Sequence, residues 1–145
     1  MILYVDSSAL VKRYVAEHGS DDVAAVLGDA VLVGTSIVTR AEVAAAFAKA
    51  RRVGAIDEPT AVAVMEAFRA DWPNLVRIAA TEHVVGVAET LAWQHGLRGY
   101  DAMQLASAVS WRSVIGQTIT VSTFDKQLWD AAGAEGFDLH PARIG

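Results

Sequence analysis

The stretch ILYVDSSAL at residues 2–10 places an acidic residue directly after a short aliphatic run. Such runs are typical of strands in a parallel sheet, because helices cover both faces of the sheet and leave neither face to solvent. Similar runs recur along the chain. The strands expected from them are residues 2–5, 31–33, 75–78 and 119–121, with residues 137–139 as a candidate fifth.

Segments with helical periodicity separate the expected strands. After the third strand, for example, Val84, Val87, Ala88 and Leu91 recur three and four residues apart and form one apolar face. The alternation predicts an α/β domain in which right-handed crossovers build a parallel sheet of four or five strands, with helices on both faces. Sheets of this kind bind ligands beyond the carboxyl ends of their strands.

Composition limits the classes of function. The 145 residues fit one domain, 1–145, and no apolar stretch reaches the roughly 18 to 20 residues of a membrane span. There is no cysteine, which excludes disulfides and thiolate zinc sites, and the first residues lack a signal-peptide pattern, so a cytoplasmic location is expected. The net charge of −5 is unusual for a protein that binds RNA phosphates, unless several acids surround a cation.

Four acidic residues lie where helices are expected to begin. Asp6 follows the first strand, Asp125 follows the fourth, and Asp101 lies in the first turn of a helix. Glu42 ends the sequence TRAE at residues 39–42, which has the pattern of a capping box. Taken singly, each acid is explained by helix capping or by a favourable interaction with the helix dipole.

Taken together, the four acids predict a metal site. Residues that follow parallel strands, and the first turns of the next helices, face the same edge of the sheet, so the four carboxylates are expected to converge. Carboxylates that share a pocket repel one another and require a cation, and oxygen ligands favour one or two Mg²⁺ or Mn²⁺ ions. Such ions position a phosphodiester and activate water, which makes phosphodiester hydrolysis the expected reaction.

The motifs around these acids resemble those of a known family. VDSSAL at 5–10, TRAEV at 39–43, YDAMQLASA at 100–108 and STFDKQL at 122–128 are similar, in order and spacing, to the four acidic motifs of the PIN domain. The length is similar to that of VapC-type toxins. The resemblance implies a three-layer α/β/α domain, Mg²⁺- or Mn²⁺-dependent endoribonuclease activity on RNA, and inhibition by a small VapB-like antitoxin.

The resemblance also implies roles for individual residues. Asp6 and Asp101 would be the principal metal ligands, and Asp125 and Glu42 would complete the site directly or through water. Thr123 matches the family's hydroxyl position, where its oxygen would hold a carboxylate or a metal-bound water.

Other polar residues near the acids have two interpretations. Ser7 and Ser8 would support the site beside Asp6 or merely cap the helix. Basic residues close to the acids in sequence would contact RNA phosphates or form an ordinary exposed surface. These candidate substrate contacts are Lys12, Arg13, Arg40, Arg98 and Lys126.

Apolar helices predict association with other chains. The Ala- and Val-rich segments at 41–50 and 60–70 carry more apolar surface than one small sheet needs, which suggests a homodimer or antitoxin interface, with burial in the core as the alternative. The resemblance to the PIN domain implies that the interface is the better interpretation. The tryptophans fall in helical patterns and are expected to pack in the core or an interface rather than stack on RNA bases. They are Trp72, Trp93, Trp111 and Trp129.

Two other functions stay open at this point. The domain could keep its acids and serve only to bind RNA or a protein partner, in which case purified protein would leave RNA uncut. A phosphatase with an aspartate nucleophile would use Asp6, but that chemistry commonly has a second Asp two residues later, where this chain has Ser8.

Overall fold

The computed structural model describes residues 1–144 and contains five parallel strands in the order β3-β2-β1-β4-β5. The predicted parallel sheet is therefore confirmed, and the candidate fifth strand forms one residue later than expected. The strands are β1 (Ile2–Val5), β2 (Leu32–Ser36), β3 (Val76–Ile78), β4 (Ile119–Ser122) and β5 (Asp138–His140).

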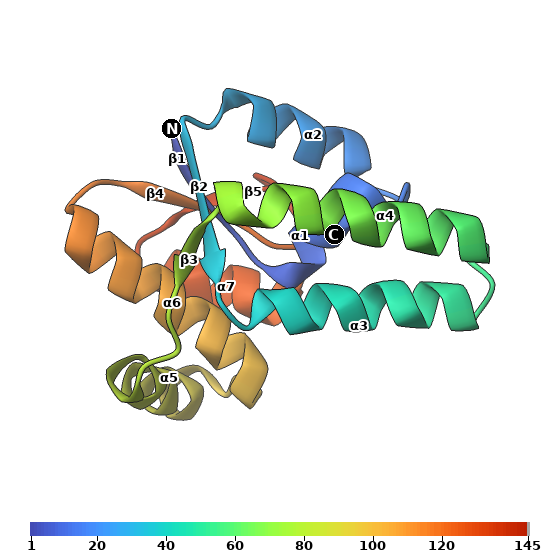
Figure 1. Cartoon of the computed structure of the whole chain (residues 1–145). Coiled ribbons are helices and arrows are strands. Elements are labelled where there is room, and N and C mark those ends of the chain that lie inside the picture. The colour runs from blue at the N-terminus through green and yellow to red at the C-terminus, as the bar shows by residue number, and fades with distance from the viewer. Residues whose placement is uncertain (145) are drawn as a thin grey trace.

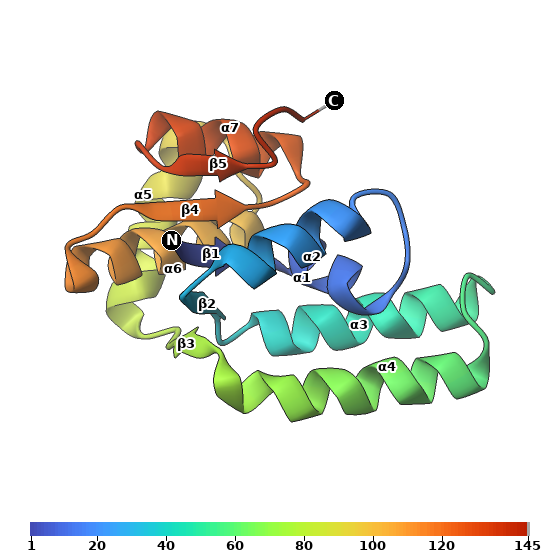
Figure 2. The same ribbon diagram turned by 90° about the horizontal axis from the view of Figure 1, so that it is seen from above.

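Helices cover both faces of this sheet, which confirms the three-layer α/β/α architecture (Figures 1 and 2). Along β1 the side chains alternate: Leu3 and Val5 pack with the first four helices, whereas Tyr4 packs with the last three. On one face lie α1 (Ser7–Tyr14), α2 (Ser20–Asp29), α3 (Thr39–Arg52) and α4 (Glu58–Asp71), followed by the short 3₁₀ helix η1 (Trp72–Asn74). On the other lie α5 (Glu82–His95), α6 (Gly99–Ile115) and α7 (Lys126–Ala134).

The strand order changes direction at β1, and parallel sheets bind ligands beyond the carboxyl ends of their strands at such a point. From β1 the chain adds β2 and β3 on one side, and then returns to add β4 and β5 on the other. The helices that follow β1 and β4 therefore lie on opposite faces of the sheet, and the carboxyl ends of these two paired strands lie side by side. Asp6 directly follows β1, and Thr123 directly follows β4.

The second strand was predicted too short. It continues past Val33 through Gly34, which has no side chain, and through the small polar residues Thr35 and Ser36, so this part does not resemble an aliphatic strand. These residues are buried nevertheless, because the Thr35 hydroxyl donates to the backbone carbonyl of Val5 at 2.7 Å and so satisfies its own polar group.

The tryptophans occupy different environments. Trp72 and Trp111 are buried in the two cores, as expected. Trp93 is 93% exposed, so of the two expected places, core or interface, the structure excludes the core for this residue. Its helix α5 packs through Leu91 and the residues a turn or two before it, and Trp93 lies on the other side of the same helix. None of the helices within residues 1–144 is long and apolar enough to cross a membrane.

We expect Gly34→Ala to destabilise the protein by about 1–3 kcal/mol, because helix α6 crosses β2 at this glycine. A Cβ at Gly34 would lie 2.6 to 2.9 Å from three ring atoms of the buried Trp111. Urea denaturation would measure the change. Gly86→Ala on α5, where a Cβ meets nothing within 4 Å, should instead stabilise by roughly 0.5–1 kcal/mol.

The clash can be separated from a general effect of alanine in a strand. Adding Trp111→Phe to Gly34→Ala should cost less than the sum of the two single changes, because the smaller ring leaves space for the new methyl group. Additive free energies would show that Trp111 is not the obstacle.

Candidate active site

Asp6 is a buried carboxylate, with only 3% of its surface exposed. It is the N-cap of α1 and accepts a hydrogen bond at Oδ1 from the backbone N–H of Ala9, at 2.9 Å. The Thr123 hydroxyl donates to Oδ2 at 2.6 Å, and the Ser8 hydroxyl lies 2.8 and 3.0 Å from the two oxygens. Asp6 therefore caps a helix and also lies at the carboxyl end of β1.

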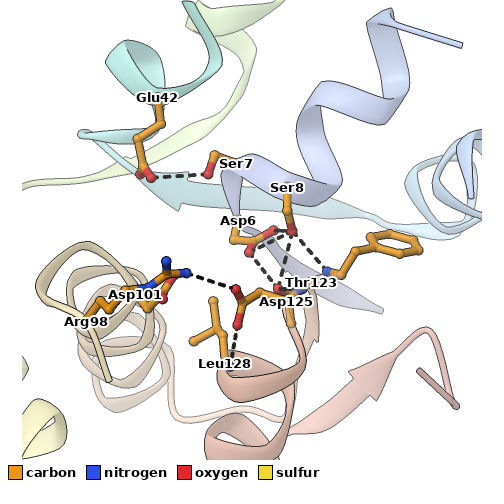
Figure 3. A network of polar contacts seen from close by, with 10 residues as sticks. Asp6, Ser7, Ser8, Glu42, Arg98, Asp101, Thr123, Asp125 and Leu128 are labelled. Carbon is orange, nitrogen blue, oxygen red and sulfur yellow. Dashed lines mark hydrogen bonds and ion pairs between the residues drawn. The ribbon is translucent and has the colours of Figure 1, made fainter. Parts of the chain in front are cut away.

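The two hydroxyls that hold Asp6 also fix the segment after β4. Thr123 Oγ1 accepts from the backbone N–H of Asp125 at 3.1 Å, and Ser8 Oγ accepts from that of Phe124 at 3.0 Å. Thr123 is fully buried. The start of α1 and the approach to α7 are thereby joined side by side, as Figure 3 shows.

Glu42 has a different environment from the one its sequence pattern indicated. The N-cap of α3 is Val38, which makes no side-chain cap, and Thr39 is already inside the helix, so the capping-box interpretation was wrong. The Glu42 carboxylate instead accepts hydrogen bonds from Gln104 Nε2 at 2.7 Å and from the Ser7 hydroxyl at 3.3 Å. Tertiary contacts with Gln104 and Ser7, and not its own helix end, therefore fix the position of the Glu42 carboxylate.

Gln104 is a site residue that the sequence analysis missed. It is 2% exposed, receives a 2.6 Å hydrogen bond from the Tyr4 hydroxyl, and donates to Thr39 Oγ1 at 2.9 Å as well as to Glu42. Its position gave one usable signal, because it follows Asp101 by three residues and so shares a helix face with it. A polar side chain on a face that is otherwise buried requires partners.

Asp101 and Asp125 both contact the guanidinium of Arg98. Asp101 is 6% exposed and lies in the first turn of α6. Arg98 brings Nε to 3.3 Å from Asp101 Oδ2 and Nη2 to 3.5 Å from Asp125 Oδ2 (Figure 3). The other oxygen of Asp125 caps α7 by accepting from the backbone N–H of Leu128 at 3.0 Å.

The other candidate substrate cations form no ion pair with the four acids in the part of the chain that the structure describes. Lys12 pairs with Glu17 and also donates to the carbonyl of His18. Arg13 pairs with Asp71 on α4, and Lys126 pairs with Asp130 on its own helix; Arg40 is exposed on the first turn of α3.

The acids influence one another electrostatically. Burial raises the pKa of Asp6 from 3.8 to about 6, against the lowering effect of its three hydrogen-bond donors, and the charge of Glu42 adds to the rise. Burial likewise raises the pKa of Glu42, with a further contribution from Asp101. Burial raises the pKa of Asp101 too. The charge of Asp125 adds to this rise, and the charge of Arg98 acts against it. Each acid is thus a neighbour of the next, and their negative charge is only partly compensated.

The ligand chemistry of the site fits a hard divalent cation. The four carboxylates are accompanied by the hydroxyls of Ser7, Ser8 and Thr123, and oxygen ligands of this kind suit Mg²⁺ or Mn²⁺. Nowhere in residues 1–144 are three histidine or acidic side chains grouped closely enough to hold an ion as they stand. Binding would therefore require the carboxylates to draw together.

Replacement of Asp6 by Asn should make stability less dependent on pH. The pKa of Asp6 is higher in the folded protein, so stability from this group is complete below about pH 4 and is lost as the pH rises through about 6. The measurement is made with a chelator present, so that no metal ion is bound. The difference in the free energy of unfolding, Asp6→Asn minus wild type, should then increase between about pH 4 and 7, by roughly 3 kcal/mol at most.

Asp57 offers a matched control, because it caps α4 through the same kind of bond, 2.9 Å to the N–H of Thr60, but its pKa is lowered by that bond. For Asp57→Asn the trend should have the opposite sign: the variant's deficit should shrink as the pH falls. Parallel pH profiles for Asp6→Asn and the wild type would contradict the assignment. Urea titrations at each pH provide the free energies.

Some known proteins are similar to this chain in sequence, and others are similar to it in fold. The PIN domain family matches residues 3–134. Ribonuclease VapC45 of Mycobacterium tuberculosis (strain CDC 1551 / Oshkosh) is 31% identical over 143 residues, which are 99% of this chain and 97% of that protein.

Two solved structures have the same fold at low sequence identity. A toxin-antitoxin complex from Klebsiella pneumoniae matches with a TM-score of 0.69 and 16% identity, covering 99% of each chain. FitAcB from Neisseria gonorrhoeae matches with a TM-score of 0.66 and 19% identity, covering 96% of each chain. Because the family match spans most of the sequence and the layered fold agrees with it, this chain belongs to the PIN domain family.

Proposed function

We propose that this protein is a metal-dependent endoribonuclease that acts as the toxin of a toxin-antitoxin pair. The observation that carries the proposal is that Asp6, Glu42, Asp101 and Asp125, from four different elements, are linked in succession. Ser7, next to Asp6, donates to Glu42, the charge of Asp101 acts on Glu42, and Arg98 contacts both Asp101 and Asp125. The relative at 31% identity is itself a ribonuclease, which supports RNA as the substrate.

The chain's own residues hold the four acids ready for this chemistry. Asp6 and Asp101 would be the main ligands, with Glu42 and Asp125 completing the set. Bound Mg²⁺ or Mn²⁺ would supply positive charge at the scissile phosphate and lower the pKa of water there.

Neutral donors fix the direction of the carboxylates. Ser8 and Thr123 orient Asp6, and Gln104 orients Glu42, without adding a positive charge that would compete for the same oxygens. Hydroxyl and amide donors thereby leave the negative charge available to a cation.

The toxin role rests on the proteins that are similar to this chain. One similar structure is a toxin-antitoxin complex, and the named relative is a VapC protein. We infer a small VapB-like antitoxin as partner, a homodimer, and action in the cytoplasm, where both RNA and antitoxin would be present. The exposed Val62 on α4 and the small apolar groove between α3 and α4 are consistent with an interface on these helices.

The phosphatase alternative is weakened by the surroundings of Asp6. The position two residues later, where that chemistry commonly has a second Asp, holds Ser8, whose hydroxyl lies 2.8 and 3.0 Å from the two oxygens of Asp6.

Asp101→Asn should reduce RNA cleavage by at least about 100-fold in the presence of Mg²⁺ or Mn²⁺, because it removes a principal ligand but keeps the shape of the side chain. Cleavage-site mapping on total cellular RNA would measure this. Asp130→Asn, which alters an exposed acid paired with Lys126, should cleave like the wild type. Undiminished cleavage by Asp101→Asn would refute the site, and intact binding of a partner by a wild type that cuts no RNA would favour a non-catalytic module.

Addition of Mn²⁺ should raise the melting temperature of the wild type by several degrees, since an ion that binds only the folded state stabilises it by mass action. The repulsion among the acids, which burial strengthens, is the energy that a cation would relieve. The rise should be much smaller in Asp101→Asn and unchanged in Asp130→Asn. Differential scanning fluorimetry with and without millimolar Mn²⁺ gives the comparison; an equal melting temperature in both conditions would argue against a metal site.

A further inference from the structure

Arg98 bridges two acids from different helices. Its guanidinium contacts Asp101 on α6 at 3.3 Å and Asp125, the N-cap of α7, at 3.5 Å. Among the ion pairs formed within residues 1–144, these are the two that involve any of the four clustered acids. Arg98 is therefore the cation already present in an otherwise acidic site.

The four acids divide into two pairs with different partners. Asp6 and Glu42 are held by neutral hydroxyl and amide donors, which satisfy hydrogen bonds without cancelling charge. Asp101 and Asp125 are held by Arg98, whose positive charge lowers the pKa of Asp101 against the effects of burial and of Asp125. Only the second pair has a charged competitor for a metal ion.

Several features of Arg98 favour release of its contacts with Asp101 and Asp125. The Arg98 side chain is 59% exposed, and both contacts are longer than a good charge-assisted bond of about 2.8 Å. Its backbone is the N-cap of α6, but the side chain makes no cap hydrogen bond, so the helix does not depend on it. The guanidinium also lies 4.7 Å from the centroid of the exposed Tyr100 ring, a cation–π contact that does not involve either carboxylate.

We propose that Arg98 is an internal counter-cation, which neutralises Asp101 and Asp125 in the metal-free protein and gives them up when a divalent cation binds. This inference rests on the proposed metal-dependent function. The two positive charges compete for the same carboxylate oxygens, so that Arg98 weakens cation binding while it stabilises the metal-free fold.

The competition predicts a gain of metal affinity when the arginine is removed. Isothermal titration of MnCl₂ into Arg98→Gln should give an affinity roughly three- to tenfold higher than that of the wild type. Arg40→Gln is the matched control: it removes the same charge from an exposed arginine two residues before Glu42, and should change the affinity by less than about twofold.

Melting temperatures distinguish competition from a merely structural role. Without metal, Arg98→Gln should melt below the wild type, because two acids lose their counter-charge. With millimolar Mn²⁺ the gap should close or reverse. A structural role alone would lower both melting temperatures by the same amount.

Side-chain NMR supplies a direct view of the exchange. On titration with Mg²⁺ the Nε–H signal of Arg98, identified by its loss in Arg98→Gln, should shift, whereas that of Arg112, which donates to the carbonyl of Glu135 away from the site, should not.

The outcomes separate the two proposals. If the wild type binds Mn²⁺ and cuts RNA, but Arg98→Gln binds the ion equally well or more weakly, the counter-cation role is refuted and the nuclease stands. If neither protein binds Mn²⁺, both proposals fail. Binding by Arg98→Gln that exceeds binding by the wild type and by Arg40→Gln supports the competition.

Discussion

The hydrogen bond from Thr123 to Asp6, 2.6 Å long, joins the carboxyl ends of the two central strands on which the rest of the sheet is built. A buried carboxylate is tolerated only when hydrogen bonds replace its water, and Asp6 obtains these from the residue after β4, from Ser8 and from the first turn of α1. The same contacts align β1, β4 and two helix starts. Because neutral groups supply them, no ion pair offsets the charge of Asp6 when it is ionised, and the acidic site and the centre of the fold are held by one set of bonds.

A second polar network connects the site residues on the two faces of the sheet. Gln104 connects Tyr4 in β1 with Thr39 and Glu42 in α3, so a helix from one face of the sheet is tied to a helix start on the other. A buried network is favourable only when every member has a partner, which limits how far any of its side chains can move. Arg98 lies outside this network, and its side chain is more than half exposed.

Local pattern predicted most of the framework but misjudged residues whose partners are distant in sequence. Aliphatic runs and alternating periodicity gave the parallel sheet, because burial on both faces imposes that composition. β2 was cut short at Val33, since Thr35 is acceptable in a core only when Val5 lies beside it. Glu42 was assigned to its own helix end, because a capping box is local whereas its true partner, Gln104, is 62 residues away. Trp93 had helical spacing, but spacing alone does not say which face of α5 meets the core.

The sequence by itself determined the order of strands and helices, the position of each acid at an element's start, and the resemblance to the PIN domain. It did so because hydrophobic period and helix-start chemistry are properties of neighbouring residues. Only the tertiary structure decided that Arg98 alone among the five nearby candidate cations contacts the acids, that Gln104 belongs to the site, and that Asp6 and Glu42 are held by neutral donors. The physical reason is that hydrogen bonds and ion pairs act over a few ångströms, and the chain must fold before distant side chains come that close.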